Sequence, residues 1–470
     1  MMESDAHAAG GPAAKNDFSK GSVAGTIFRL ALPMIGAQLI NALYNIVDRI
    51  YIGRIEGIGR DALTGVGVTF PILMIVSAFT ALCGQGGAPL CSIARGAGDK
   101  DRAERIMGNA FTLLVLSGVL VTAVGLIFKR PVLYLFGASD VTYPFANDYV
   151  TIYLCGSLFV MIGLGMNAFI NAQGFAATGM LSVLIGAVLN ILLDPLFIFA
   201  FGWGVRGAAV ATVVSQAASA VWVLLFLTGR RTILRLRFRQ MKLQWAIVRR
   251  ILMLGLTGFF MKLTNSAVQV SCNATLQAFG GDLYVGVMTV VNSVREVLMM
   301  PVSGLSSGSE PFVSYNYGAG HYDRVRKGFR VMAAGCIIYS VCAWAAVEAV
   351  PALVIRIFNS EAELVQAGIP AVRIYFAAYW VLSLQMAGQS GFVALNRPKQ
   401  AVFFSLLRKG IIVVPLVLLL PRLGLGTAGV FLAEPISDFI GSTACFTTFL
   451  LTVWPKLKTP DAAEAQTGKI

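Results

Sequence analysis

The chain has 470 residues, of which 57% are hydrophobic and only 13% are charged, and its mean hydropathy is +0.74. A soluble globular domain carries about 25% charged residues, so this composition argues against that class and predicts a polytopic membrane protein. The net charge of +14 comes from lysines and arginines in short loops between apolar segments. That pattern is typical of membrane topology and not of a nucleic-acid partner.

Six membrane-spanning helices are predicted in the first half of the chain. Four uncharged segments approach or exceed the roughly 17–25 residues that cross a bilayer as a helix, namely 30–47, 62–94, 107–128 and 207–229. A fifth uncharged run, 149–193, is long enough for two helices that separate near Gln173 and Gly174.

Six further helices are predicted in the second half, beginning near Ile251, Tyr284, Arg330, Val365, Ala401 and Thr427. An even number of helices places both termini on one side of the membrane. That side also receives most of the basic clusters, which are 95–105, 230–250, 324–330 and 397–409. Because basic loops stay in the cytoplasm, both termini are predicted to be cytoplasmic.

The predicted organisation has five parts: a disordered cytoplasmic tail (1–22), an N-lobe (23–228), a cytoplasmic basic linker (229–250), a C-lobe (251–454) and a second cytoplasmic tail (455–470). The first tail lacks an apolar surface that could dock, so it is expected to be dispensable. The linker alternates basic and apolar residues, which indicates a segment on the inner membrane surface, either a topology anchor or a lipid sensor.

One motif occurs twice. Residues 96–106 read GAGDKDRAERI and residues 318–328 read GAGHYDRVRKG, 222 residues later. The same offset aligns further positions, among them Gly86 with Gly308, Pro89 with Pro311, Gly207 with Gly429 and Ser215 with Ser437. Since each half holds six helices, the halves are predicted to be parallel repeats related by an axis along the membrane normal. Paired bundles of this kind are typical of transporters that open a central cavity alternately to each face.

Polar side chains gather in the predicted outer half of the N-lobe. Asn190 and Asp194 are four residues apart and share a helix face, followed by Thr212 on the next helix and preceded by Asp48 on the first. A charged side chain at the bilayer centre costs about 2.5–3.5 kcal/mol, so it needs a partner. Two carboxylates with amide and hydroxyl oxygens suit Na+, and the same two carboxylates, if close, would share a proton.

Two structural alternatives stay open for these residues. Asp48 could pair with Arg49 or Arg54 at the end of its helix. Thr212 could hydrogen-bond the backbone of its own helix, as threonines in helices often do.

Five stretches together resemble multidrug and toxic compound extrusion (MATE) transporters: LYNIVDRIYIG, GQGGAPLCSIARGAG, NILLDP, GAAVATVVSQ and LAEPISD. The resemblance covers about residues 25–455 and is closest to bacterial members whose ion site lies in the first lobe. It implies an all-α membrane protein with two six-helix lobes in a V, in the bacterial plasma membrane. It also implies export of amphipathic, often cationic, compounds in exchange for Na+ or H+.

Carried over residue by residue, the resemblance places cation-coupling ligands, with Na+ as the possible metal, at Asp48, Asn190, Asp194 and Thr212. It places neighbouring cavity residues at Tyr44 and Asn167, and Asn41 and Asn45 share the helix face of Asp48 and join that predicted substrate cavity. No cofactor is expected beyond the coupling ion. The expected partners are a small amphipathic substrate and membrane lipid, with the chain acting as a monomer.

The second lobe does not repeat this set, because Asn190, Asp194 and Thr212 correspond to Ile412, Leu416 and Glu434. The coupling site is therefore predicted to be single. The C-lobe instead carries embedded charges, which are expected to pair with one another and hold the lobe together: Lys262, Arg295, Glu296, Glu310 and Glu434.

Other functions fit less well. A membrane-embedded enzyme would need nucleophiles or bases at an interface, but the two histidines are His7 in the tail and His321 in a loop. There is no GxxxxGK[ST] loop for ATP. The seven cysteines have no metal-type spacing and are interpreted as small core residues. A lipid-linked oligosaccharide flippase of the same superfamily remains the nearer alternative, although such proteins usually have more helices and a cationic cavity.

Overall fold

The computed structural model describes residues 16–358 and 361–457, and the described residues form helices joined by short turns, with no strand among them. The first half contains α2 (Val23–Gly53), α3 (Gly59–Gly96), α4 (Lys100–Leu135), α5 (Tyr143–Ala172), α6 (Ala176–Pro195), the π-helical turn η1 (Leu196–Ala200) and α7 (Gly204–Thr228). Since η1 continues α6, these are six spans, as predicted.

The second half contains η2 (Phe238–Gln240), α8 (Trp245–Gly318), α9 (Tyr322–Ala349), α10 (Pro351–Arg356), α11 (Ala362–Phe376), α12 (Tyr379–Ala394), α13 (Pro398–Leu406), the π-helical η3 (Leu407–Val413), α14 (Val414–Leu419), η4 (Pro421–Leu423), α15 (Gly426–Thr452) and η5 (Pro455–Leu457). The 74 residues of α8 would span about 111 Å if straight. Gly281, at φ 66° and ψ −164°, breaks α8 into two spans.

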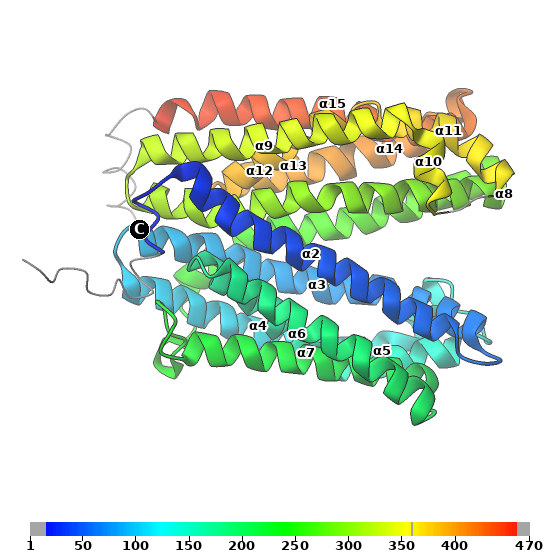
Figure 1. Cartoon of the computed structure of the whole chain (residues 1–470), viewed down its shortest axis with the longest axis horizontal. Coiled ribbons are helices and arrows are strands. Elements are labelled where there is room, and N and C mark those ends of the chain that lie inside the picture. Colours follow the sequence, from blue (N-terminus) through cyan, green and yellow to red (C-terminus); the bar gives the residue numbers. More distant parts are fainter. Residues whose placement is uncertain (1–15, 359–360, 458–470) are drawn as a thin grey trace, which may run out of the picture.

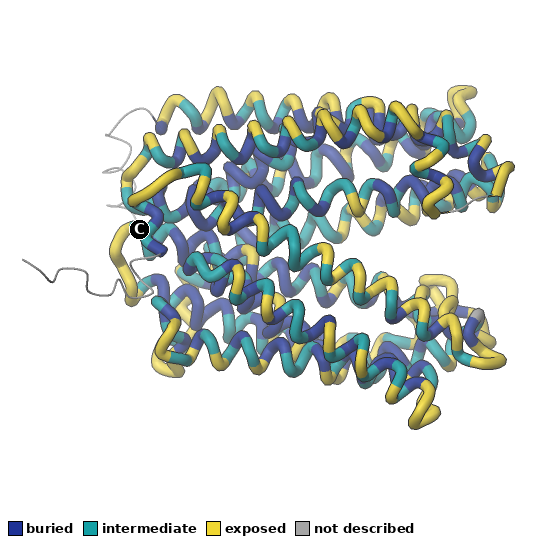
Figure 2. The backbone as a smooth tube through the Cα atoms, in the orientation of Figure 1, coloured by how far each residue is buried: buried dark blue, intermediate teal, exposed yellow. Residues whose placement is uncertain are grey.

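The described residues account for twelve spans. Eight helices are long and apolar enough to cross a membrane alone, and the pair α11 and α12, bent by 43°, makes a ninth. The two parts of α8 and the acid-containing α15 complete the set. Large apolar side chains remain exposed along many of these helices, as lipid contact requires (Figure 2).

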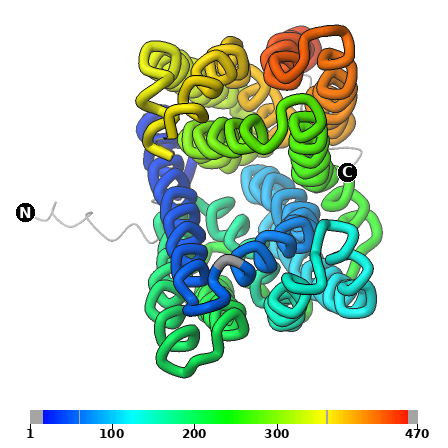
Figure 3. The backbone as a smooth tube through the Cα atoms, turned by 90° about the vertical axis from the view of Figure 1, so that its right-hand side faces the viewer, coloured from blue at the N-terminus to red at the C-terminus, as the bar shows by residue number. Residues whose placement is uncertain are grey.

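The helices form two bundles, an N-lobe of α2–α7 and a C-lobe of α8–α15 (Figures 1 and 3). The lobes converge where residues 16–22, the linker 229–244 and Leu457 lie, on the left of Figure 1, and diverge toward the opposite end. We call the first of these ends the terminal end. Within this V-shaped arrangement, α2 packs both on α6 of its own lobe and on α8 of the other.

The duplicated motif closes the terminal end. A Cβ atom on Gly96 would lie 1.9 Å from the carbonyl oxygen of Tyr315, and one on Gly318 would lie 2.0 Å from the carbonyl oxygen of Ile93. The ends of α3 and α8 therefore pack backbone to backbone, and only glycine fits at the two equivalent positions. The two copies of the motif predicted from the sequence therefore contact each other and join the lobes at this end.

Residues 16–22, predicted to belong to a disordered tail without a docking surface, are docked between the lobes. The prediction is wrong for these residues, because Phe18 is fully buried. Its ring lies 5.4 Å from the ring of Tyr315 and 6.1 Å from that of Phe312. Arg95 of the N-lobe covers the Phe18 ring at 5.0 Å. The rest of the predicted tail, residues 1–15, lies outside the described residues, as do residues 458–470 of the second.

Hydrogen bonds fix the backbone of this docked segment. Arg324 of α9 donates to three carbonyl oxygens at 3.0–3.1 Å, those of Phe18, Lys20 and Gly21. From the other lobe, Arg95 donates to the carbonyl oxygens of Asn16 and Ala172. One guanidinium of each lobe therefore holds the segment in place.

The linker also differs from its prediction. It packs against the N-lobe, and it ends at Gln244 instead of residue 250, because α8 begins at Trp245. Buried polar side chains anchor it. Gln173 Oε1 accepts hydrogen bonds from the linker at Thr232, Ile233 and Leu234, at 2.7–2.9 Å. Asn109 Nδ2 donates to the Lys242 carbonyl oxygen at 3.1 Å, and Glu104 Oε1 accepts from the Arg235 backbone at 3.0 Å.

Candidate cation-coupling site

Four predicted ligands meet in the N-lobe, on three helices. Asn190 and Asp194 lie on α6, Asp48 on α2 and Thr212 on α7, and all four are buried. The Asn190 Nδ2 atom lies 3.3 Å from Asp194 Oδ1 and 3.5 Å from Thr212 Oγ1. The carboxyl groups of Asp48 and Asp194 lie close enough to interact directly. The i, i+4 spacing on α6 and the packing of α2 on α6 bring them together.

The backbone beside Asp194 is irregular. Pro195 follows it and removes a helix hydrogen-bond donor, and the next five residues, Leu196–Ala200, form a π-helical turn. Single π-turns of this kind occur often at functional sites. The sequence showed the proline but gave no signal for the π-turn.

Three oxygens of the cluster have no hydrogen-bond partner in the described structure. They are Asp48 Oδ1, Asn190 Oδ1 and Asp194 Oδ2, and all three are buried. Burying unpaired oxygens of this kind is unfavourable, most of all on carboxylates, so the group is suited to a bound cation or proton. The donors are all oxygens, which hard cations prefer. The described residues contain no group of three or more His, Cys, Asp and Glu side chains placed to hold a metal ion.

The geometry favours the cluster over both structural alternatives. None of the ion pairs within the described residues includes Asp48, so neither Arg49 nor Arg54 forms a salt bridge with it, and its carboxyl group lies beside that of Asp194. The Thr212 hydroxyl meets Asn190. Each side chain thus interacts with another helix of the lobe.

Three of the four predicted cavity residues lie on α2 with Asp48, and one of them, Tyr44, lies beside the cluster. The hydroxyl group of Tyr44 lies near Asn45, Gln216 of α7 and the carboxyl group of Asp48. Asn45 Nδ2 donates to the Asn41 carbonyl oxygen at 2.6 Å, and both of these asparagines are exposed.

Asn167 is placed differently. Its Nδ2 atom donates to the Gly179 carbonyl oxygen at 2.9 Å and to Ser182 Oγ at 2.7 Å. The side chain is buried and joins α5 to α6. The structure therefore gives Asn167 a packing role and does not bring it to the cluster.

Two residues of the site were not identified from the sequence. Tyr149 of α5 is buried, and its hydroxyl group lies near Thr212 and Asp48. Gln216 follows Thr212 by one helical turn and contacts Tyr44. The i, i+4 spacing could have identified Gln216, but nothing in the sequence separates Tyr149 from the other aromatic residues of its apolar run.

The C-lobe has a buried charge cluster centred on Glu434. Glu434 Oε1 accepts from Arg295, from Arg408 at 3.2 Å and from Lys409 at 2.5 Å. Arg408 also pairs with Asp438 at 2.7 Å. The predicted mutual pairing is confirmed for Arg295 and Glu434, and these contacts join α8, η3 and α15.

The other charged residues that were predicted to pair in the C-lobe are not part of this cluster. Glu296 is exposed, Glu310 accepts a hydrogen bond from Ser390 at 3.0 Å, and Lys262 takes part in no ion pair of the described residues. Arg408 and Lys409, predicted to lie in a basic cytoplasmic loop, are buried inside the membrane-spanning α13–α14 unit. That prediction was wrong because a basic pair can lie within a span when acids on α15 neutralise it.

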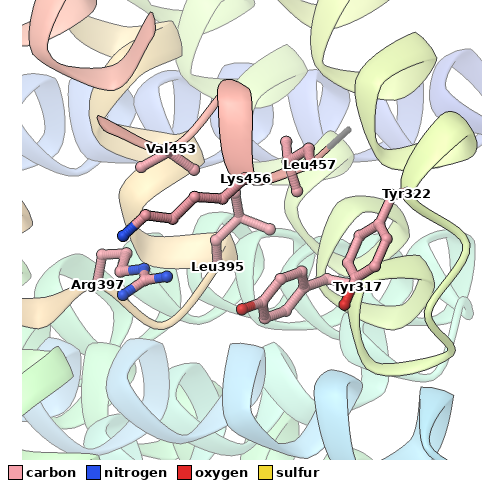
Figure 4. A pocket seen from close by; sticks show the side chains of 7 residues that line it. All are labelled: Tyr317, Tyr322, Leu395, Arg397, Val453, Lys456 and Leu457. Carbon is pink, nitrogen blue, oxygen red and sulfur yellow. The ribbon is translucent and has the colours of Figure 1, made fainter. Parts of the chain in front are cut away.

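A small pocket near the terminal end lies apart from these clusters (Figure 4). It is lined by Tyr317, Tyr322, Leu395, Arg397, Val453, Lys456 and Leu457. Its volume of about 30 Å³ leaves room for little more than a water molecule, so it is no substrate site.

In the part of the chain that the structure describes, twelve spans form two parallel lobes, and a cluster of buried carboxylates without an ion-pair partner lies in the N-lobe. This arrangement is that of a polytopic membrane transporter. The MatE family model matches residues 33–196 and 259–419, and the chain therefore belongs to the MATE family of multidrug efflux transporters.

Three comparisons agree with this assignment. The multidrug export protein MepA of Staphylococcus haemolyticus is 22% identical over 430 residues, covering 90% of this chain and 93% of that protein. The FAD transporter of Shewanella oneidensis is 23% identical over 438 residues, covering 89% and 93%. A solved outward-facing conformation of a multidrug resistance MATE family transporter of the MOP superfamily superposes with a TM-score of 0.86 at 22% identity, covering 96% of this chain and 99% of that one.

Proposed function

We propose that this transporter exports small amphipathic molecules in exchange for Na+ or H+, by alternating access of its two lobes. The observation that carries the proposal is the buried contact of Asp48 with Asp194, together with the unpartnered oxygens around it. Two carboxyl groups in contact cannot both stay charged without a cation or proton between them. Binding either one removes that repulsion.

The position of α2 offers a route from the ion to the lobes. A cation held between Asp48 and Asp194 joins α2 to α6, whereas α2 also packs on α8 of the C-lobe. Binding the ion therefore favours one arrangement of α2 and shifts the balance between the two states of the transporter. The substrate does not need to touch the ion for the two to be coupled.

We place both termini in the cytoplasm of a bacterial cell, because the terminal end carries the basic clusters that the positive-inside rule assigns to that side. With this orientation, the packing of α3 on α8 at the terminal end corresponds to a state closed to the cytoplasm and open to the outside. A monomer suffices, since one chain supplies both lobes. Surrounding lipid contacts the exposed apolar side chains.

The charge of the substrate is a separate question. The acids of the N-lobe led to the sequence prediction of a cationic substrate. One relative is a FAD transporter, whose named substrate carries negative phosphates. The proposal of cation-driven export holds for either charge, because Asp48 and Asp194 serve the coupling ion.

The test uses purified protein in liposomes with a fluorescent substrate and an imposed Na+ or pH gradient. Transport should follow one of the two gradients and stop when it is collapsed. The same movement without either gradient would show that neither ion drives the transporter and would overturn the proposal. A set of dyes of both charges prevents a wrong choice of substrate from hiding the activity.

A further inference from the structure

Lys262 is a charged side chain at the middle of a membrane span. It lies 17 residues after Trp245, the first residue of α8, which is about 26 Å along the helix and close to midway to the break at Gly281. It is half-buried. An ionisable residue at this depth is retained for a partner or a function.

The partner is not a protein carboxylate. Among the described residues Lys262 forms no ion pair, whereas Arg295, Arg408 and Lys409 of the same lobe share Glu434. The charge pairing that stabilises the C-lobe therefore leaves Lys262 out.

The helix places Lys262 on the side that faces the N-lobe. Gly255 and Gly258, seven and four residues earlier on the same face, both touch α3: a Cβ on Gly255 would lie 1.8 Å from the Leu82 carbonyl oxygen, and one on Gly258 2.6 Å from Gln85 Oε1. Lys262 is one turn farther from the terminal end, in the direction in which the lobes diverge (Figure 1).

Aromatic rings accompany the ammonium group at this level. The ring of Phe259 lies 5.4 Å from the ring of Phe79 on α3, in an edge-to-face arrangement across the lobe boundary. Gln85, one turn along α3 from Ala81, is exposed and adds an amide. Within one helical turn of Lys262, α8 thus contacts an aromatic ring and an amide side chain of α3, across the boundary between the lobes.

We infer that Lys262 binds an acidic group of the transported molecule, and that Phe79 and Phe259 contact its apolar body. The substrate class is an amphipathic organic anion, such as an aromatic carboxylate, sulfonate or phosphate. This inference rests on the proposed export function and names its substrate class, in place of the cation that the sequence suggested. The coupling cation keeps its own site, because Asp48 and Asp194 lie on α2 and α6 of the N-lobe.

Binding without any gradient tests the inference with two dyes that share a xanthene body. Fluorescein is an anion and rhodamine 6G is a cation, and each is titrated with transporter in lipid nanodiscs while fluorescence anisotropy is followed. We expect wild-type protein to prefer fluorescein. Lys262→Met should weaken fluorescein binding by about tenfold or more and leave rhodamine 6G unchanged or tighter, since it removes one charge. Lys262→Arg should retain the preference.

The exposed Lys327 provides the matched control, because Lys327→Met removes the same charge at the terminal end. Size-exclusion chromatography and thermal denaturation verify folding, and Lys262→Gln replaces the methionine variant if that one does not fold. Equal fluorescein affinity in wild type and Lys262→Met, or a wild-type preference for rhodamine 6G, would overturn the inference. Loss of gradient coupling with the dye preference intact would overturn only the proposed antiport.

Discussion

Asp48 of α2 and Asp194 of α6 are 146 positions apart in the chain, and their buried carboxyl groups lie close enough to interact directly. No arginine or lysine ion pair neutralises either acid in the described residues. A mobile cation or proton is therefore the natural counter-charge.

Asp194→Asn should abolish gradient-driven export while the protein still inserts and folds. The change keeps the shape of the side chain and removes its charge. One cation moving through 100 mV supplies about 2.3 kcal/mol, which corresponds to about a 50-fold concentration ratio. Accumulation of substrate under an imposed gradient measures the loss. Leu416→Asn, at the equivalent position of the C-lobe, is the control and should be mild. Normal export by Asp194→Asn would contradict the single-site proposal.

Asp48→Asn combined with Asp194→Asn should be little worse than either substitution alone. Both acids act on the same ion, so removing the second loses nothing that the first has not already removed. Transport rates of wild type, two single variants and the double variant form the thermodynamic cycle. Independent, multiplying losses would show that the two carboxylates serve different ions.

Gly96→Ala should hinder closure of the terminal end. The added Cβ would lie 1.9 Å from the Tyr315 carbonyl oxygen, so α3 and α8 must separate. Spin labels on the two lobes at the terminal end should report longer distances and slower transport. Gly67→Ala is the matched control on α3, because its Cβ would meet nothing within 4 Å. Unchanged distances in Gly96→Ala would mean that this contact does not limit closure.

Phe18→Ala should weaken closure through a different contact. The ring is fully buried against the C-lobe and covered by Arg95 of the N-lobe. Truncating a buried phenylalanine costs about 3–5 kcal/mol in a core, and only the state with the docked segment bears that cost. The same spin labels should show a larger population open at the terminal end. Lys20→Ala is the control, because the exposed Lys20 contributes only a backbone carbonyl to Arg324.

Glu434→Gln should destabilise the C-lobe. The change leaves Arg295, Arg408 and Lys409 buried with one carboxylate, that of Asp438. Breaking a buried charge network costs about 3–5 kcal/mol. Thermal denaturation in detergent should show a clear drop in the midpoint, while Glu296→Gln, which alters an exposed acid of the same lobe, should leave it in place. Equal midpoints would show that the cluster is not structural.

Most of the fold could be predicted from the sequence, because a helix that contacts lipid needs a long apolar run. The internal repeat independently indicates that the chain divides into two similar halves. The cation cluster could also be predicted from the sequence. Asn190 and Asp194 are polar residues at the end of an uncharged run, and their spacing of four places them on one helix face. The packing of three helices then selects Asp48 and Thr212 as neighbours.

Other features had no pattern to predict them. A single Phe18 in a polar tail has no periodicity, so its burial depends on a groove formed by residues about 300 positions later. Arg408 and Lys409 were assigned to a predicted loop, and only the acids of α15 show that they belong inside the span. Asn167 is polar and near the site in sequence, but the helix turns it toward Ser182.

The segment that precedes the first helix of each lobe packs on the other lobe. Residues 16–22 lead into the N-lobe but dock on Asn316 and Arg324 of the C-lobe. The linker leads into the C-lobe but is anchored by Glu104 and Asn109 of the N-lobe. During synthesis the linker finds its anchors already made, whereas the N-terminal segment must wait until the ribosome has delivered α8 and α9. Its docking therefore follows the synthesis of α9, more than 300 residues after the segment itself has been made.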